Sequence, residues 1–115
     1  MPGALLVFVG GGLGASLRYL TALLVGGPLA VLTVNIAGSF AIGLLAGAVP
    51  AEAGNVRLFF MTGVLGGFTT FSAFSLDALS LWQRGEIMAA TAYVAASIIL
   101  AVGAAAFGLM LGRAM

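Results

Sequence analysis

Hydrophobic residues fall in four long stretches along this chain, and short polar, glycine or proline breaks separate them. We expect these stretches to form helices at residues 3–25, 29–49, 58–82 and 87–111. Each is close to the ~20 apolar residues that a helix needs to cross the hydrocarbon core of a bilayer. The pattern therefore predicts an all-α integral membrane protein, with four transmembrane helices in a single domain at residues 1–115.

The composition favours contact with lipid over most of the surface. Hydrophobic residues make up 63% of the chain and charged residues 6%, and the mean hydropathy is +1.26. A soluble domain carries about a quarter charged residues, so a soluble fold is excluded. The chain has neither cysteine nor histidine, and no nucleophile, base or metal-ligand cluster in it indicates an enzyme. It also has no run of basic residues, which would indicate a nucleic-acid partner.

The third stretch contains an interruption that an ordinary membrane helix does not need. Gly66 and Gly67 are followed, after one phenylalanine, by the hydroxyl pair Thr69 and Thr70. Backbone that leaves helical geometry in hydrocarbon must have its N–H and C=O groups satisfied by protein, water or an ion. We therefore expect the third helix to be broken in mid-membrane near residues 66–71, at a site for an ion or a substrate, with the incoming helix ending near Gly66.

The arginines give no preferred direction of insertion. Four crossings place Arg57 and Arg113 on one side of the membrane. Arg84 lies on the other side, together with Arg18 if that side chain extends outward from the end of its helix. Orientation follows the excess of Lys and Arg in short loops, and here the two sides are equal. The balance predicts dual topology and an antiparallel homodimer. Insertion in one orientation, decided by a single charge and the N-terminal amine, stays open.

Glycines spaced four residues apart open one face on several of the predicted helices. Such faces let helix backbones approach closely in lipid. The pairs are Gly10 and Gly14, Gly43 and Gly47, Gly63 and Gly67, and Gly108 and Gly112. Packing within the chain and packing between copies are both consistent with this spacing.

Three motifs occur in a fixed order that matches a known family. They are GGLGASLRY at residues 11–19, TVNIAGSF at residues 33–40 and GGFTTFSAF at residues 66–74. Together with the chain length and the four-crossing layout, they resemble the Fluc (CrcB) fluoride channels. The resemblance implies a dual-topology homodimer in the inner (plasma) membrane, with two antiparallel pores and a central structural sodium ion. It also implies passive export of cytoplasmic fluoride, which gives fluoride resistance.

The resemblance further implies the residues of the fluoride path. Asn35 would line the path with its amide NH₂, and a hydrogen bond across helices is the alternative use of that group. Phe71 and Phe74 would contact fluoride through their ring edges, which carry partial positive charge. Thr70 and Ser72 would supply further donors. Because the chain has no lysine, the path would depend on neutral donors.

Two more parts of the site follow from the same resemblance. On the last helix, Tyr93 and Ser97 would belong to a polar track along the pore, whereas Ala101 carries no hydroxyl to continue it. An ordinary interfacial position is the alternative for the tyrosine. The sodium ion would be held by main-chain oxygens that map to Gly66 and Thr69, at the negative end of the incoming half-helix.

Some assignments stay open from the sequence. Arg18 is consistent with extension to the interface, pairing with Asp77, or a place in an anion-attracting vestibule. Ser39 lies one turn from Asn35, and its hydroxyl is equally consistent with a bond to its own helix. Ala73 stands where many family members have a small hydroxyl. Two other functions remain alternatives: a small dual-topology multidrug exporter, for which Asp77 would be the proton-exchanging carboxylate, and a noncatalytic membrane assembly subunit.

Overall fold

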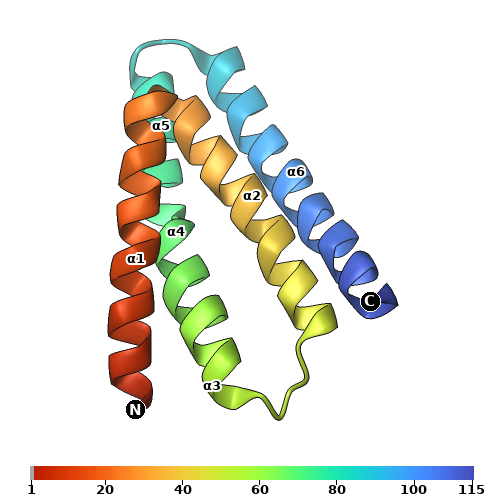
Figure 1. Ribbon diagram of the computed structural model, residues 1–115. Helices are drawn as coiled ribbons and strands as arrows, with labels where there is room; N and C mark the ends of the chain where they lie inside the picture. Colours follow the sequence, from red (N-terminus) through yellow and green to blue (C-terminus); the bar gives the residue numbers. More distant parts are fainter. Residues whose placement is uncertain (1) are drawn as a thin grey trace.

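The computed structural model describes residues 2–115, and it is helical over most of that range (Figure 1). In chain order the elements are α1 (Gly3–Leu24), α2 (Gly27–Ala48), α3 (Gly54–Arg57), the π-helix η1 (Leu58–Leu65), α4 (Gly66–Phe68), α5 (Phe71–Gln83) and α6 (Ile87–Ala114). Four helical stretches within the described residues are long and apolar enough to cross a membrane: Gly3–Leu24, Gly27–Ala48, Gly54–Gln83 and Ile87–Ala114. These stretches correspond to the four that the hydrophobic pattern predicts.

The observed helices begin earlier than predicted at two places. The second helix starts at Gly27 and holds Pro28 in its first turn, where the missing N–H has no intrahelical partner to lose. The third stretch starts at Gly54, so the polar residues before Leu58 are already helical. Arg57 explains this, because its guanidinium bonds the Ala46 and Val49 carbonyls at the end of α2 at 3.0–3.3 Å. The guanidinium therefore has hydrogen-bond partners while Arg57 lies within a helix.

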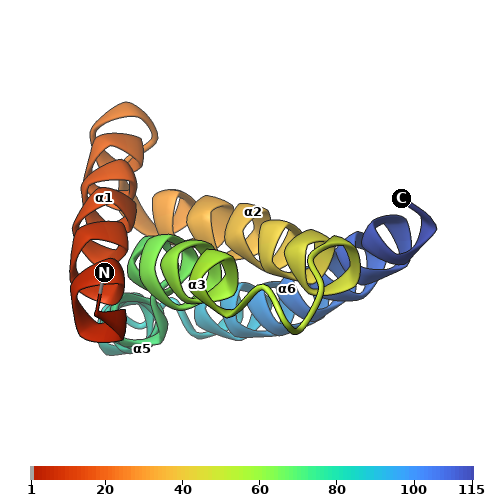
Figure 2. The same cartoon turned by 60° about the horizontal axis from the view of Figure 1, so that its bottom comes forward.

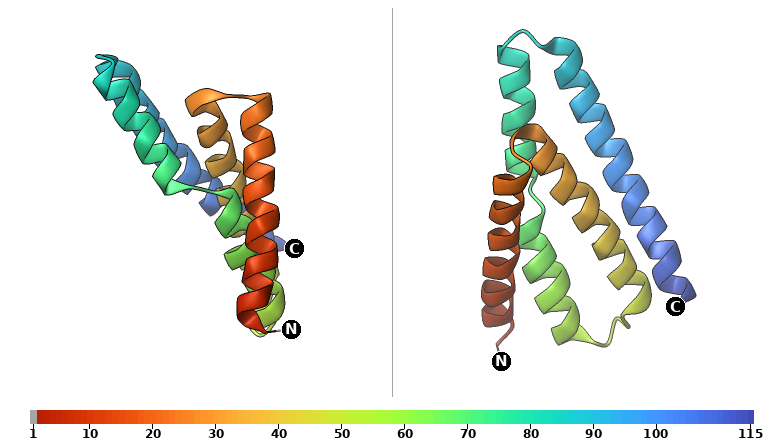
Figure 3. Two further views of the ribbon diagram at one scale, coloured as in Figure 1. Left: turned by 90° about the vertical axis from the view of Figure 1, so that its left-hand side faces the viewer. Right: turned by 45° about the horizontal axis from the view of Figure 1, so that its top comes forward.

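The helices pack in two groups, and α2 contacts both of them. One group holds α1 against η1 and α4, and the other holds α2 and α5 against α6. Figure 2 shows α2 and α6 running alongside each other, with α1 beside the α3 end of the third stretch. In Figure 3, α5 and the start of α6 lean away from the turn between α1 and α2. Both chain ends and the α2–α3 turn lie at one end of the molecule, opposite the α5–α6 turn (Figure 1).

Glycines set the close approach of backbones in both groups. A Cβ at Gly14 would collide with the Val64 carbonyl oxygen, and a Cβ at Gly67 would collide with the Gly11 carbonyl oxygen. In the other group, a Cβ at Gly43 would meet the Ala105 carbonyl. All eight glycines of the spaced pairs lie against the backbone of another helix of the same chain: Gly10, Gly14, Gly43, Gly47, Gly63, Gly67, Gly108 and Gly112. The paired glycines therefore serve packing within the chain.

Substitution of Gly14 should show how closely α1 packs. Gly14→Ala is expected to destabilise the protein by about 1–3 kcal/mol, because the added methyl meets backbone that must shift. Gly12→Ala is the matched control, since no heavy atom lies within 4 Å of a Cβ there. Alanine in an open helical position should be neutral or stabilising by up to ~1 kcal/mol. Thermal unfolding in detergent measures both variants, and equal melting temperatures would contradict this packing.

Candidate functional site

The third stretch leaves helical geometry at Thr69 and Thr70. Their φ and ψ angles are −85°, 155° and −152°, 123°, and both lie in the extended region. The incoming helix continues to Phe68, two residues beyond the end expected near Gly66. It continues because the Thr69 N–H and hydroxyl both donate to the Leu65 carbonyl, at 3.0 and 2.9 Å, and so complete its last turn. A new helix, α5, begins at Phe71.

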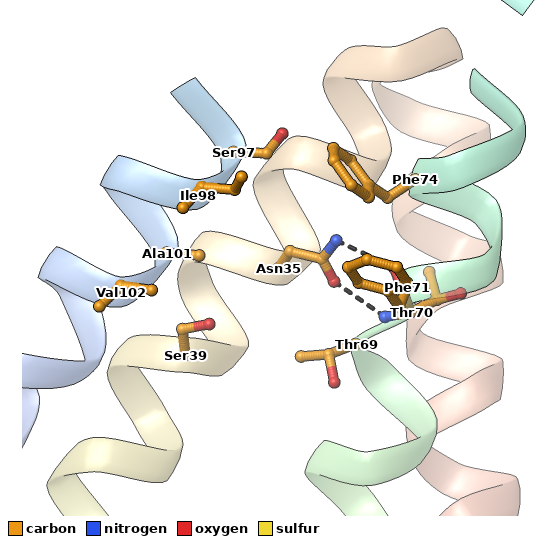
Figure 4. Close-up of a pocket in the computed structure, with 10 residues that line it drawn as sticks. All are labelled: Asn35, Ser39, Thr69, Thr70, Phe71, Phe74, Ser97, Ile98, Ala101 and Val102. Carbon is orange, nitrogen blue, oxygen red and sulfur yellow. Dashed lines mark hydrogen bonds between the residues drawn. The ribbon is translucent and has the colours of Figure 1, made fainter. Parts of the chain in front are cut away.

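The two extended residues, Thr69 and Thr70, are called the extended step below. Asn35 on α2 binds this step through both the NH₂ and the carbonyl oxygen of its amide. Its Nδ2 donates to the Thr70 carbonyl at 3.0 Å, and its Oδ1 accepts from the Thr70 N–H at 2.8 Å. Figure 4 shows this side chain directed at Thr70 across the gap between the helices. The amide therefore supplies a donor and an acceptor to backbone that has left the helix. This hydrogen bond uses one of the two N–H groups of Nδ2, and the second N–H is a further donor.

Arg18 on α1 binds the end of the helix that leads into the step. Its Nε donates to the Gly67 carbonyl at 3.1 Å, and the contact is partly buried. Pairing with Asp77, one of the possibilities from the sequence, is not what the guanidinium does. Within residues 2–115 the salt bridge is between Arg84 and Glu86, at 2.9 Å.

The hydroxyl of Thr70 caps the new helix. Its Oγ1 accepts from the Ala73 N–H at 3.2 Å and lies 3.2 Å from the Ser72 hydroxyl. A threonine in this position is a favourable N-cap. The break therefore brings together the C-terminal end of one helical run, which carries partial negative charge, and the N-terminal end of α5, which carries partial positive charge. Such an arrangement favours a cation on one side of the step and an anion on the other.

A cleft of about 310 Å³ opens beside this step. Its walls come from α2, the extended step with the start of α5, and one face of α6 (Figure 4). The lining residues are Asn35, Ser39, Thr69, Thr70, Phe71, Phe74, Ser97, Ile98, Ala101 and Val102. Of the residues predicted for the fluoride path, Ser72 and Tyr93 are absent from this lining.

Aromatic rings continue from the cleft into the protein. The Phe71 and Phe74 ring centroids are 5.3 Å apart, and those of Phe74 and Tyr93 are 5.4 Å apart. Phe71 is 77% exposed, whereas Phe74 and Tyr93 are each 8% exposed. The two phenylalanines on α5 thus differ sharply in burial, and Tyr93 lies in the core behind the cleft.

Two buried hydroxyls near the cleft have no hydrogen-bond partner among the described residues. They belong to Tyr93 and Ser97, and Ser97 lines the cleft. Buried polar groups in proteins are nearly always satisfied. The Ser97 hydroxyl is therefore a donor or acceptor that a molecule or ion in the cleft could use.

The break also frees main-chain oxygens that could hold a cation. In a continuous helix the Gly66 carbonyl would accept from the Thr70 N–H, which instead bonds Asn35. The Thr69 carbonyl would likewise accept from the Ala73 N–H, which instead bonds the Thr70 hydroxyl. The described residues hold no cluster of His, Cys, Asp or Glu with metal-ligand potential. Carbonyl oxygens at an unwound helix end are ligands that suit sodium.

Sequence reasoning missed part of this site. It did not connect Asn35 to Thr70 or Arg18 to Gly67, because the members of these pairs are separated by 35 and 49 positions in the sequence. It also missed Ile98 and Val102 as lining residues. Ile98 and Val102 are four residues apart and share a face of α6, as Ser97 and Ala101 do, but this spacing does not show which face meets the cleft.

Comparison with known proteins gives a family match over most of the chain. Residues 5–109 match the family model described as CrcB-like protein, Camphor Resistance (CrcB). The chain is 54% identical over 118 residues to the fluoride-specific ion channel FluC of Rhodospirillum centenum, covering 95% of this chain and 94% of that protein. It is 49% identical to the proteins of the same name from Paracoccus denitrificans and Mesorhizobium japonicum. Those two alignments cover 95% and 96% of this chain, and 93% and 96% of the relatives.

Proposed function

Because the chain belongs to the CrcB family, whose similar members are named fluoride-specific ion channels, we propose that it conducts fluoride passively across the membrane. It is a multi-pass membrane protein and a channel, not an enzyme. Its role is to let fluoride leave the cytoplasm of a bacterium through the plasma membrane. Hydrogen fluoride enters cells as a neutral weak acid and dissociates, so a conducting exit gives resistance.

The observation that carries this proposal is the cleft beside the extended step. Fluoride is small and strongly hydrated, so a selective path must replace its water with donors in a narrow space. The cleft offers the second amide N–H of Asn35, the Ser97 hydroxyl and the Phe71 ring. All of these groups are neutral. They can bind an anion without holding it so tightly that conduction stops.

We assign roles along the path from this geometry. Asn35 donates to fluoride while it holds Thr70, and the edges of Phe71 and Phe74 face the ion. Ser97 continues the path along α6. Tyr93 is buried against Phe74 and supports the position of that ring. Its hydroxyl, which has no partner, is a further polar group behind the path. Ser72 acts through its contact with the Thr70 hydroxyl.

The working unit is an antiparallel homodimer of dual topology. Two features support this. Phe71 is 77% exposed although it belongs to the site, so a second copy is needed to enclose it. The arginines also give little preference of direction, because Arg57 and Arg113 lie toward one end, Arg84 lies toward the other, and Arg18 is bonded to Gly67 between them. A structural sodium ion lies between the copies and is held by the freed carbonyls of Gly66 and Thr69 from each.

Sodium removal tests the ion and the assembly together. Replacing sodium with N-methyl-D-glucamine should lower the melting temperature of the purified protein and shift it from dimer toward monomer. The reason is that four carbonyl oxygens would face one another without a cation between them. Light scattering on a size-exclusion column reports the mass, with potassium as a second cation. A dimer that is equally stable in the organic cation would rule out the sodium proposal.

The multidrug-exporter reading is not favoured by the site. Its proton-exchanging carboxylate would have to be Asp77, which is partly buried on α5 and does not line the cleft. Exchange of protons for a cationic drug needs that carboxylate to be within reach of the substrate.

Growth on fluoride tests the proposed function in cells. A bacterial strain that lacks its own fluoride exporter should regain growth in fluoride when it produces this protein. A vector without the gene and a medium containing equal chloride are the controls. If the protein is shown to be in the membrane and the strain stays fluoride-sensitive, the proposal is wrong.

A further inference from the structure

Arg18 binds the end of the helix that leads into the extended step, two residues before Thr69. The bond joins Nε to the Gly67 carbonyl at 3.1 Å and spans 49 residues of sequence. Gly67 is one of the last residues of a helical run, whose final carbonyls have no intrahelical donor. In a continuous helix that carbonyl would accept from the N–H of Phe71. Arg18 therefore stands in for a helical donor that the break removes.

The packing of α1 explains how the arginine reaches this carbonyl. Gly14 lies directly against the backbone of Val64 and Phe68, so α1 and the third stretch approach without side chains between them. Arg18 follows Gly14 by four residues and projects from the same face of α1. The next backbone group along that face is the end of α4, where Gly67 is.

We propose that Arg18 is a positioning residue for the fluoride site, and that it acts through its Nε–H bond to Gly67 and not through its charge. The proposal rests on the function proposed above. Arg18 is not among the residues that line the cleft, so it does not meet the ion there. Its effect reaches the ion through the extended step and Phe71.

The state that Arg18 opposes is a third helix that continues through the break. Without the guanidinium, the Gly67 carbonyl can be satisfied by the Phe71 N–H. That bond requires helical geometry at Thr69 and Thr70. Helical geometry there would separate Thr70 from Asn35, because the amide now bonds both polar groups of that residue. Phe71 would rotate away with them, and the cleft would lose its aromatic wall.

Three substitutions at one position separate the bond from the charge. In Arg18→Gln, the side-chain nitrogen is attached at the same place along the chain as Nε, so the donor is kept and the charge is lost. In Arg18→Lys, a methylene takes that place, so the charge is kept and the donor there is lost. Arg18→Met has neither the donor nor the charge. Ser16→Ala is the control on α1, because it removes a side-chain bond to the helix's own Gly12 carbonyl.

Fluoride release from vesicles is the first measurement. We expect Arg18→Gln to stay within about threefold of the wild type, and Arg18→Lys and Arg18→Met to fall about tenfold or more, since leaving the Gly67 carbonyl without its donor has an effect of that size. Fluoride release that is normal in the lysine variant and low in the glutamine variant would overturn the proposal in favour of charge. Normal release in all three, or equal loss in all three, would overturn it as well.

Hydrogen–deuterium exchange on the same samples needs no ion flux. The amides of Thr69 and Thr70 should exchange at the wild-type rate in Arg18→Gln and at a changed rate in Arg18→Met. A wild type that releases no fluoride would count against the proposed function alone, whereas exchange that is equal in all variants would count against the role of Arg18 alone.

Discussion

Asn35→Asp should reduce fluoride release from vesicles by at least ~100-fold while the protein still assembles in the membrane. The substitution keeps the shape of the side chain and removes its N–H donors. A carboxylate oxygen would then face the Thr70 carbonyl, where a bond of 3.0 Å now exists. Leaving two partly buried acceptors opposed costs about 1–3 kcal/mol at that contact. The carboxylate would also place a negative charge where an anion must pass, which adds repulsion.

Asn55→Asp is the control for this prediction. It is the same chemical change on an exposed residue of α3, outside the cleft. Its fluoride release should equal that of the wild type. Size-exclusion chromatography checks that both variants assemble. Substantial fluoride release through well-assembled Asn35→Asp protein would mean that the amide neither positions Thr70 nor meets the ion.

Phe71→Ile should lower fluoride release by about tenfold or more, with little change in thermal stability. The substitution removes the ring edge and keeps a shorter apolar side chain, and because Phe71 is 77% exposed, little packing within the chain is lost. Phe71 is the better choice for this test than Phe74. The latter is 8% exposed and packs on Tyr93, so its loss would also disturb the core.

Phe8→Ile provides a matched comparison on α1. Phe8 is 78% exposed and Phe71 is 77% exposed in the single chain, so both substitutions remove a ring of similar exposure. The control should conduct as the wild type does, because Phe8 does not line the cleft. Equal fluoride release in the two variants would leave Phe71 without a special role in the path.

The four helical stretches could be predicted because lipid imposes their length and apolar character. Their exact ends could not, because local contacts decide them. Pro28 looked like a separator and is instead part of the first turn of α2. The segment before Leu58 looked like a polar loop, but Arg57 reaches carbonyls of α2 eight and eleven positions earlier and lets the helix start at Gly54.

The region of the break could be predicted from its glycines and hydroxyls, but its partners could not. Thr69 and Thr70 carry the extended geometry, and the glycines before them are helical. Gly67 suggested a helix break from the sequence, but it lies within α4. Its missing side chain lets the backbone of α1 pack against it. Which side chains would bind the freed backbone depends on how α1 and α2 are placed, and no local pattern records that.

Helix geometry explains which predicted residues fall outside the cleft. Phe71 and Phe74 are three residues apart on α5 and therefore share a face, whereas Ser72 lies about a quarter turn from Phe71. Its hydroxyl touches that of Thr70 and does not line the cleft. Tyr93 and Ser97 share a face of α6, but the tyrosine is far enough along to be covered by Phe74. A sequence shows such spacing without showing where the neighbouring helix ends.

The most direct test of the central claim is fluoride release from sealed vesicles that contain the purified wild-type protein. A fluoride electrode records the release after a potassium ionophore is added, and chloride-loaded vesicles are measured in parallel with a chloride electrode. We predict rapid release of fluoride and no release of chloride above that of protein-free vesicles. Absence of fluoride release from protein shown to be folded, or equal release of both anions, would contradict a fluoride-selective path through this cleft.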